Sequence, residues 1–267
     1  MTTYTLGIDA GSSFAKAVVM QDGKLRAFAA IPSGGNYAEA ARKVSMEALE
    51  KAALSNADLS TTVATGYGAA AVDFADRTLP DISCHAAGVF HFFPSARTVI
   101  DIGSQFCRAI KMDGDGRATN FIMNEKCAGG SGKFLQVIAR ILHMSVEDIG
   151  PLSMEAKSPV EFTTGCAVFA ESEAVSRIAE GASPADILAG VHKAMSAKIA
   201  NLTIRLGLAR DCAVTGGGAK DIGLIRTLET ELGVGLLVPE EPRISAAIGA
   251  ALLGTNQSCT VTTVTHS

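Results

Sequence analysis

Cys127 and Cys166 carry the least common chemistry in the sequence, because each lies just ahead of a stretch with helical periodicity. Cys127 is followed by the small residues 129–132 and then by apolar residues at the i, i+1, i+4, i+7 and i+8 positions of an amphipathic helix: Phe134, Leu135, Ile138, Ile141 and Leu142. After Cys166 the helical pattern places Val168, Val175 and Ile178 on the inward face. A helix N-terminus, with its free backbone N–H groups, stabilises a thiolate or an anionic cluster that thiolates hold.

Both cysteines have a plainer interpretation as small buried apolar residues, which is what most free cysteines are. The chain contains six cysteines, and no two of them form a Cys-x-x-Cys pair. In a cytoplasmic protein, this spacing argues against a disulfide framework and against a complete metal site within one chain. If a cluster exists, its ligands must be pooled from more than one chain.

The composition excludes several classes of partner. The chain has 267 residues, 48% of them hydrophobic, with a formal net charge of −4, no tryptophan and no run of basic residues. Neither nucleic acid nor an anionic membrane is therefore expected as a partner. We see no signal-peptide pattern and no apolar run of membrane-spanning length, so the sequence predicts a soluble, cytoplasmic protein.

A repeated segment predicts that the chain contains two related halves. Residues 8–18 align without a gap to residues 100–110, with Ile, Asp, Gly, Ser, Phe and Ala matching at the same offsets. In this alignment Lys16 faces Arg108. Each copy reads as a strand, a tight turn and a returning strand, and the match indicates an internal duplication.

The repeated turns have the residue types of a nucleotide phosphate site. Each strand ends in an aspartate, Asp9 or Asp101, whose carboxylate can reach Mg²⁺ through water. The residues that follow offer backbone N–H groups and side-chain donors to phosphate, with Lys16 as a nearby cation. These residues are Gly11, Ser12 and Ser13 in the first turn, and Gly103, Ser104 and Gln105 in the second. Two such turns in two similar lobes would clamp a nucleotide's phosphates from both sides.

A third glycine turn, Gly216, Gly217 and Gly218, strengthens the nucleotide interpretation. A Walker-type loop is the competing site, and residues 129–133 resemble one superficially. However, its first required glycine falls on Cys127 and the residue after Lys133 is Phe134, so we set that loop aside.

Periodicity and turn signals predict an α/β protein. The expected strands span 4–9, 14–21, 24–31, 61–65, 117–123, 212–215 and 236–238, and the expected helices span 37–54, 86–93, 184–206, 221–232 and 245–253. A helix-like segment is also expected between residues 68 and 86, and the polar tail 256–267 is expected to fray.

The order of the three turns resembles the actin/hexokinase/Hsp70 superfamily, whose members bind ATP in a cleft between two ribonuclease-H-like lobes. The resemblance implies that residues 1–95 with 244–267 form the first lobe and residues 96–243 the second. It also implies that Gly216, Gly217 and Gly218 lie near adenosine. Asp101 is the expected residue for polarising the attacking water, or else it only orders the metal shell.

Four motifs narrow the resemblance: residues 123–135, 164–173, 64–68 and 215–219. They are similar to those of the activators of 2-hydroxyacyl-CoA dehydratases and the ATPase subunits of benzoyl-CoA reductase. The resemblance implies a dimer in which Cys127 and Cys166 of each protomer jointly hold one [4Fe-4S] cluster. It further implies ATP/ADP and Mg²⁺ as ligands, electrons from a ferredoxin or flavodoxin, and delivery to an iron–sulfur acyl-CoA dehydratase or reductase.

Two departures mark this sequence within the family pattern. Phe106 stands where the activators usually have aspartate, and Ala69 stands where they often have arginine. The first departure favours the benzoyl-CoA reductase type, in which two related ATPase chains can pair, so either a homodimer or a heterodimer is expected. Two rival functions remain open: a small-molecule kinase of the same fold, and a non-redox nucleotide-gated binding module.

Overall fold

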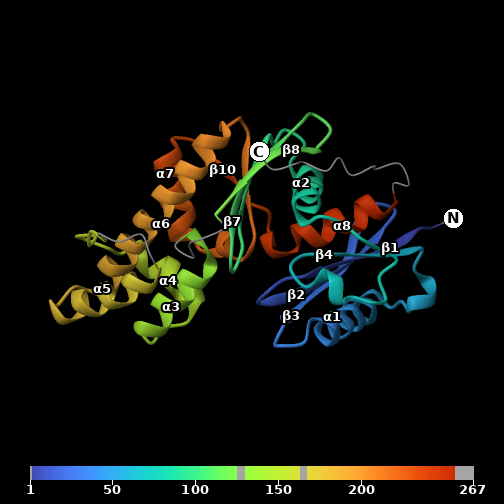
Figure 1. The fold of residues 1–267 in the computed structure, drawn as a ribbon, viewed down its shortest axis with the longest axis horizontal. Helices are drawn as coiled ribbons and strands as arrows, with labels where there is room; N and C mark the ends of the chain where they lie inside the picture. The colour runs from blue at the N-terminus through green and yellow to red at the C-terminus, as the bar shows by residue number, and fades with distance from the viewer. Residues whose placement is uncertain (1, 125–129, 163–166, 256–267) are drawn as a thin grey trace. The chain divides into compact units, whose positions relative to one another are not determined.

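The computed structural model describes residues 2–124, 130–162 and 167–255, so Cys127 and Cys166 lie outside the described residues. The chain divides into two compact units (Figure 1). The first comprises residues 1–97, 110–120 and 243–267, and the second comprises residues 98–109 and 121–242. We describe each unit by itself, and the domain boundaries expected from the sequence stay a prediction.

The first unit is built on a five-stranded sheet in the order β3-β2-β1-β4-β5. Its strands are β1 (Tyr4–Ala10), β2 (Phe14–Gln21), β3 (Lys24–Pro32), β4 (Thr61–Thr65) and β5 (Arg77–Thr78). The first three strands are antiparallel, as the hairpin signals predict, and β4 pairs in parallel with β1. Asp22 and Gly23, both with positive φ, close the turn between β2 and β3.

This sheet is covered by the helices α1 (Tyr37–Ala52), α2 (Asp81–Phe92) and α8 (Ser245–Thr255). Figure 1 shows α1 below the strands and α2 and α8 above them. Successive side chains of β2 point to opposite faces of the sheet, so both faces need a covering helix. Val19 packs on the face that α1 covers, while Val18 and Met20 pack on the face that α8 covers.

The second sheet has the order β10-β9-β6-β7-β8. Its strands are β6 (Thr98–Ile102), β7 (Cys107–Met112), β8 (Ala118–Met123), β9 (Cys212–Thr215) and β10 (Leu236–Leu237). Strand β9 is parallel to both β6 and β10. The helices of the second unit are α3 (Gly132–Ile141), α4 (Val146–Ser153), α5 (Ala167–Ala179), α6 (Pro184–Leu206) and α7 (Ile222–Leu232). The duplication is therefore confirmed in backbone form, since each sheet sets a parallel strand beside the first strand of its hairpin.

Some sequence expectations were wrong in detail. The segment after residue 68 forms only a 3₁₀ turn, Ala69–Ala71, and the short strand β5, while α2 begins at Asp81. Val175 and Ile178 are 53% and 42% exposed, because α5 packs through its small residues Ala170 and Ala174 instead. None of the helices in the described ranges is both long enough and apolar enough to cross a bilayer.

Helices α2 and α8 approach closely enough that their glycines must stay glycines. A Cβ atom on Gly88 would lie 1.8 Å from the Ser245 carbonyl oxygen, and one on Gly249 would lie 1.8 Å from the Cys84 carbonyl oxygen. On the sheet, a Cβ on Gly7 would lie 1.9 Å from the Ala247 carbonyl oxygen. These contacts are with backbone, which has little freedom to move aside.

We therefore expect Gly249→Ala to lower the free energy of unfolding by about 1–3 kcal/mol, the usual cost of overpacking a core. Urea denaturation followed by circular dichroism measures this change. Gly35→Ala is the matched control, because no heavy atom of the described residues lies within 4 Å of its Cβ position. Equal stability of the two variants would contradict the close packing of α2 on α8.

Candidate functional site

The first turn presents a buried carboxylate paired with a lysine. Asp9 is the next-to-last residue of β1 and is 6% exposed, and it faces Lys16 across the antiparallel pair. The Lys16 Nζ lies 2.7 Å from Asp9 Oδ2. Ser12 and Ser13 are partly exposed at the tip of the turn. The turn therefore combines an anchored charge pair with accessible hydroxyl groups, which suits a metal-bound phosphate.

Two neighbours from outside the repeated segment shape this first turn. Ser33, which follows β3, donates from its Oγ to the Gly11 carbonyl at 2.6 Å and from its N–H to the Ser13 carbonyl at 2.9 Å. Gly66, with φ of +91°, follows β4 and lies against Asp9, where a Cβ atom would come within 2.3 Å of Oδ1. Gly66 is required because both the backbone conformation and the closeness to the carboxylate exclude a side chain.

The second turn repeats this arrangement. Asp101 is the next-to-last residue of β6, is 1% exposed, and lies 3.1 Å from the Arg108 guanidinium through its Oδ2. The Gly103 N–H donates to the Phe106 carbonyl at 3.0 Å, which closes the turn. Gln105 is exposed, while Gly103 and Ser104 are partly exposed. Arg108 is thus the cation that pairs with Asp101, as Lys16 pairs with Asp9. The gapless alignment, which matches Lys16 with Arg108, indicated this correspondence.

The second turn is also bonded directly to the start of α3. The N–H groups of Gly132 and Lys133 donate to the carbonyls of Gly103 and Ser104, at 2.8 and 2.9 Å. The sequence suggested that the N–H groups at this helix end are free to face an anion. For Gly132 and Lys133 this was wrong, because the second turn supplies their acceptors.

The third glycine turn meets the second one inside the same unit. Gly216 has φ of +86°, and a Cβ atom on it would lie 2.5 Å from Asp101 Oδ1. A Cβ on Gly218 would lie 2.3 Å from Ile102 Cγ2. The parallel register that pairs Asp101 with Thr215 produces this closeness. The same register pairs Asp9 with Thr65, so Gly66 is the counterpart of Gly216.

Neither predicted cluster ligand can be located, because Cys127 and Cys166 lie outside the described residues. The helices that follow them, α3 and α5, pack against each other, and Phe134, Ile138, Ala170 and Ala174 share one core.

The described cysteines do not fit a ligand role. Cys84, Cys107 and Cys212 are buried free thiols. Burial raises the pKa of Cys84 and of Cys212 to about 12, and it raises that of Cys107 as well. Metal ligation requires the thiolate. Among the described residues, no three or more His, Cys, Asp or Glu side chains gather as metal ligands would. A magnesium ion held through water needs only the single carboxylates that the turns supply.

Comparison with known proteins gives a consistent result over nearly the whole chain. The model of the BadF/BadG/BcrA/BcrD ATPase family matches residues 6–254. The activator of lactoyl-CoA dehydratase from Anaerotignum propionicum is 40% identical, covering 93% of this chain and 96% of that protein. A subunit of benzoyl-CoA reductase from Thauera aromatica is 35% identical, covering 94% and 93%.

Comparison with solved structures agrees with these relatives in sequence. The activator of the 2-hydroxyisocaproyl-CoA dehydratase from Clostridium difficile, with bound ADPNP, superimposes with a TM-score of 0.90 at 36% identity, covering 94% of each chain. A ROK family glucokinase from Streptomyces griseus shares the fold alone, with a TM-score of 0.58 at 13% identity over 94% and 98% of the two chains. The predicted fold of the actin/hexokinase type is therefore confirmed.

Thiol labelling tests the assignment of the described cysteines. With their pKa values raised by burial, the thiols of Cys84, Cys107 and Cys212 stay protonated at pH 8 and should resist iodoacetamide in the folded protein. Peptide mass spectrometry after labelling, with and without guanidinium, measures this protection. Labelling of Cys212 in the folded protein at the rate seen in guanidinium would contradict its burial.

Proposed function

Because the chain belongs to the BadF/BadG/BcrA/BcrD ATPase family, we propose that it is an ATP-hydrolysing [4Fe-4S] electron-transfer protein. In this role it drives low-potential electrons into a partner iron–sulfur enzyme of the benzoyl-CoA reductase or (R)-2-hydroxyacyl-CoA dehydratase type. The relatives named as a dehydratase activator and as part of a benzoyl-CoA reductase support this role. So do the two phosphate turns, which repeat one charge arrangement.

The turns bind ATP through distinct groups. Backbone N–H groups and hydroxyls at Ser12, Ser13 and Ser104 contact phosphate oxygens, and Lys16 neutralises part of their charge. Asp9 orders the water shell of a magnesium ion. Gly216 to Gly218 leave the backbone open beside the nucleoside, since a side chain on Gly216 or Gly218 would collide with β6.

Hydrolysis requires a water molecule aligned with the terminal phosphate. Water attacks phosphorus, the bond to the bridging oxygen breaks, and ADP and inorganic phosphate are released. Asp101 accepts a hydrogen bond from this water and orients it. Its buried contacts with Arg108 and Gly216 hold the carboxylate in one position. Such positioning supplies most of the catalysis in phosphoryl transfer.

The cluster would be held by Cys127 and Cys166 of two protomers, and when bound it supplies a site for a single low-potential electron. The observation that carries the coupling of ATP to this site is the pair of backbone bonds between the second turn and α3. Gly132 and Lys133 bond to Gly103 and Ser104, only a few residues beyond Cys127. A shift of the turn on hydrolysis therefore pulls directly on the helix that follows a ligand.

We also propose a second ATPase chain and an electron donor as partners. In α5, which follows Cys166, Val175 and Ile178 lie three residues apart on one face and are 53% and 42% exposed, and an exposed apolar face can serve as a contact surface. This supports a dimer through α5, with either an identical or a related ATPase chain. A ferredoxin or flavodoxin supplies the electron, and we propose that all of these proteins meet in the cytoplasm.

Iron analysis after anaerobic purification tests the cluster. We expect about four irons per dimer, and an absorbance that bleaches with dithionite. Cys127→Ser should lose both signals and keep ATP hydrolysis. Cys84→Ala is the matched control and should keep the iron, since Cys84 is buried in the first unit. An iron-free wild-type dimer with intact ATPase activity would overturn the redox proposal.

The coupling route can be tested at one backbone atom. Gly132→Pro removes the N–H that donates to Gly103 and puts a ring carbon in its place, so the Gly103 carbonyl must move away from α3. Proline fits the first helical position itself, where the preceding Ser131 is already extended. We expect ATP hydrolysis to persist within about twofold while ATP-dependent reduction of the partner enzyme falls by about tenfold or more.

Gly132→Ala is the control for this variant, because it keeps the N–H and its Cβ would make ordinary contacts, the nearest at 3.4 Å. Steady-state phosphate release and stopped-flow reduction of the partner separate the two activities. Unchanged coupling in Gly132→Pro would show that the bond to the second turn does not transmit the effect of hydrolysis.

A further inference from the structure

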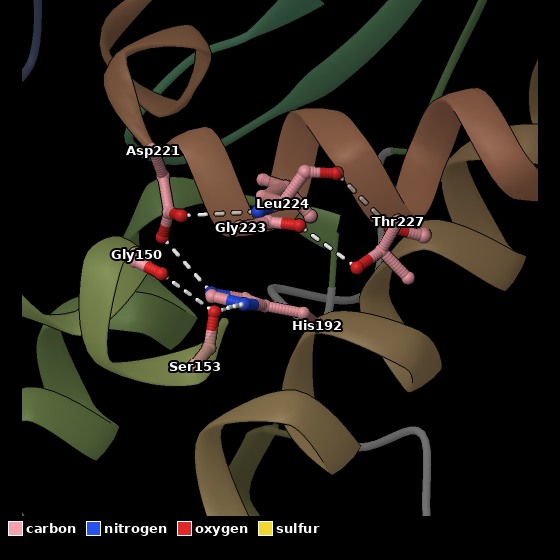
Figure 2. A network of polar contacts seen from close by, with 8 residues as sticks. Gly150, Ser153, His192, Asp221, Gly223, Leu224 and Thr227 are labelled. Carbon is pink, nitrogen blue, oxygen red and sulfur yellow. Dashed lines mark hydrogen bonds and ion pairs between the residues drawn. The ribbon is translucent and has the colours of Figure 1, made fainter. Parts of the chain in front are cut away.

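A buried polar network in the second unit is not explained by the proposed chemistry (Figure 2). Its centre is His192 of α6, whose side chain is fully buried and bonded at both ring nitrogens. Nδ1 lies 3.0 Å from Ser153 Oγ on α4, and Nε2 lies 2.9 Å from Asp221 Oδ2 at the start of α7. One imidazole therefore joins three helices.

Two helical glycines make this network possible. A Cβ atom on Gly223 would lie 2.1 Å from Ser153 Oγ and 2.8 Å from the His192 ring, and one on Gly150 would lie 2.6 Å from Asp221 Oδ1. Any side chain at either position would separate the helices from the imidazole. The packing of α4, α6 and α7 is thus shaped around His192.

Serine, histidine and aspartate in this order are also the groups of a hydrolase triad, but their environment excludes that role. Ser153 is 6% exposed, and its Oγ already donates to the Gly150 carbonyl at 2.7 Å. A nucleophile needs an open side for its substrate and a base able to take its proton. With His192 at 0% exposure, the described residues enclose the network on every side, and its role is positional.

The position it fixes is that of the third glycine turn. Asp221 follows the 3₁₀ turn Gly217–Lys220, and its N–H donates to the Gly218 carbonyl at 3.2 Å. Its Oδ1 accepts from the Leu224 N–H at 3.0 Å and so caps α7, while Oδ2 meets His192. Asp221 is therefore the joint between the glycine turn and the helix behind it, and His192 holds that joint.

We propose that His192 is a positioning residue for nucleotide binding, acting through Asp221 on the turn Gly216–Gly218. This inference rests on the proposed function, in which that turn faces the adenosine part of ATP. A turn held in one place contacts the nucleoside without first being ordered, which favours binding. Among the described residues, His192 bonds to Ser153 and Asp221 and not to either phosphate turn, so its larger effect is on affinity for the nucleoside and the hydrolytic step changes less.

Replacing His192 by asparagine or glutamine tests its two hydrogen bonds one at a time. The side-chain nitrogen of asparagine can replace Nδ1 of histidine, and that of glutamine can replace Nε2. His192→Gln thus keeps a donor for Asp221 and loses the bond to Ser153, while His192→Asn does the reverse. Both variants lose the same ring, so a general loss of packing affects them alike.

We expect His192→Asn to raise the KM for ATP by about tenfold with kcat within about twofold, and His192→Gln to change KM by less than about threefold. Inhibition by inorganic tripolyphosphate, which has no nucleoside, should be the same in both variants and in the wild type. ATPase assays over a range of ATP concentrations measure these constants, with thermal denaturation recorded alongside.

Equal losses of thermal stability in the two variants with an unchanged KM would overturn the inference and leave a purely structural network. Failure of the proposed function is distinct, because the wild type itself would then show no ATP hydrolysis. If His192→Asn does not fold, Asp221→Ser replaces it, since serine can still cap α7 but is too short to reach His192. A wild-type KM in Asp221→Ser would equally overturn the inference.

Discussion

Each unit depends on a carboxylate buried at the end of its first strand. Asp9 and Asp101 are 6% and 1% exposed, and a buried charge is costly unless a partner and polar contacts compensate for it. Lys16 and Arg108, on the returning strands, provide the compensation. Gly66 and Gly216 then let the neighbouring parallel strands run directly past the carboxylates. One buried charge therefore accounts for three features of the fold. The hairpin supplies the compensating cation, and the glycine after the parallel strand leaves room for the carboxylate.

The second unit adds two connections that the first unit does not need. Its phosphate turn is bonded to α3, and its glycine turn is joined through Asp221 and His192 to α4 and α6. Helix α4 packs in turn on α3. The second turn thus reaches α3 by direct bonds, and the glycine turn reaches it by bonds to α4 and the packing of α4 on α3. A displacement of either turn is opposed by packed helices, so it is transmitted through the unit and not absorbed in a loop.

How much could be predicted from the sequence depends on how local each feature is. The hairpins, the paired aspartates and the opposition of Lys16 and Arg108 follow from one gapless repeat, because strand register repeats with sequence. Ser33 and His192 carry no such signal, since the partners of Ser33 lie 20 or more residues away and those of His192 lie 29 or more residues away. The exposed Val175 and Ile178 were misassigned for a related reason, because periodicity marks an apolar face without stating whether alanines pack better.

The first turn of α3 changes how a helix end can act in the proposed function. Its positive end was expected to stabilise negative charge near Cys127, but the Gly132 and Lys133 N–H groups are bonded to carbonyls of the phosphate turn. Phosphate charge arriving at that turn acts on the same helix end as charge carried after ligation at Cys127. Since the dipole effect falls off within one helical turn, the two charges compete for one short segment. In the proposed function, nucleotide state and redox state would therefore be linked by electrostatics as well as by movement, and charging either site would affect the other.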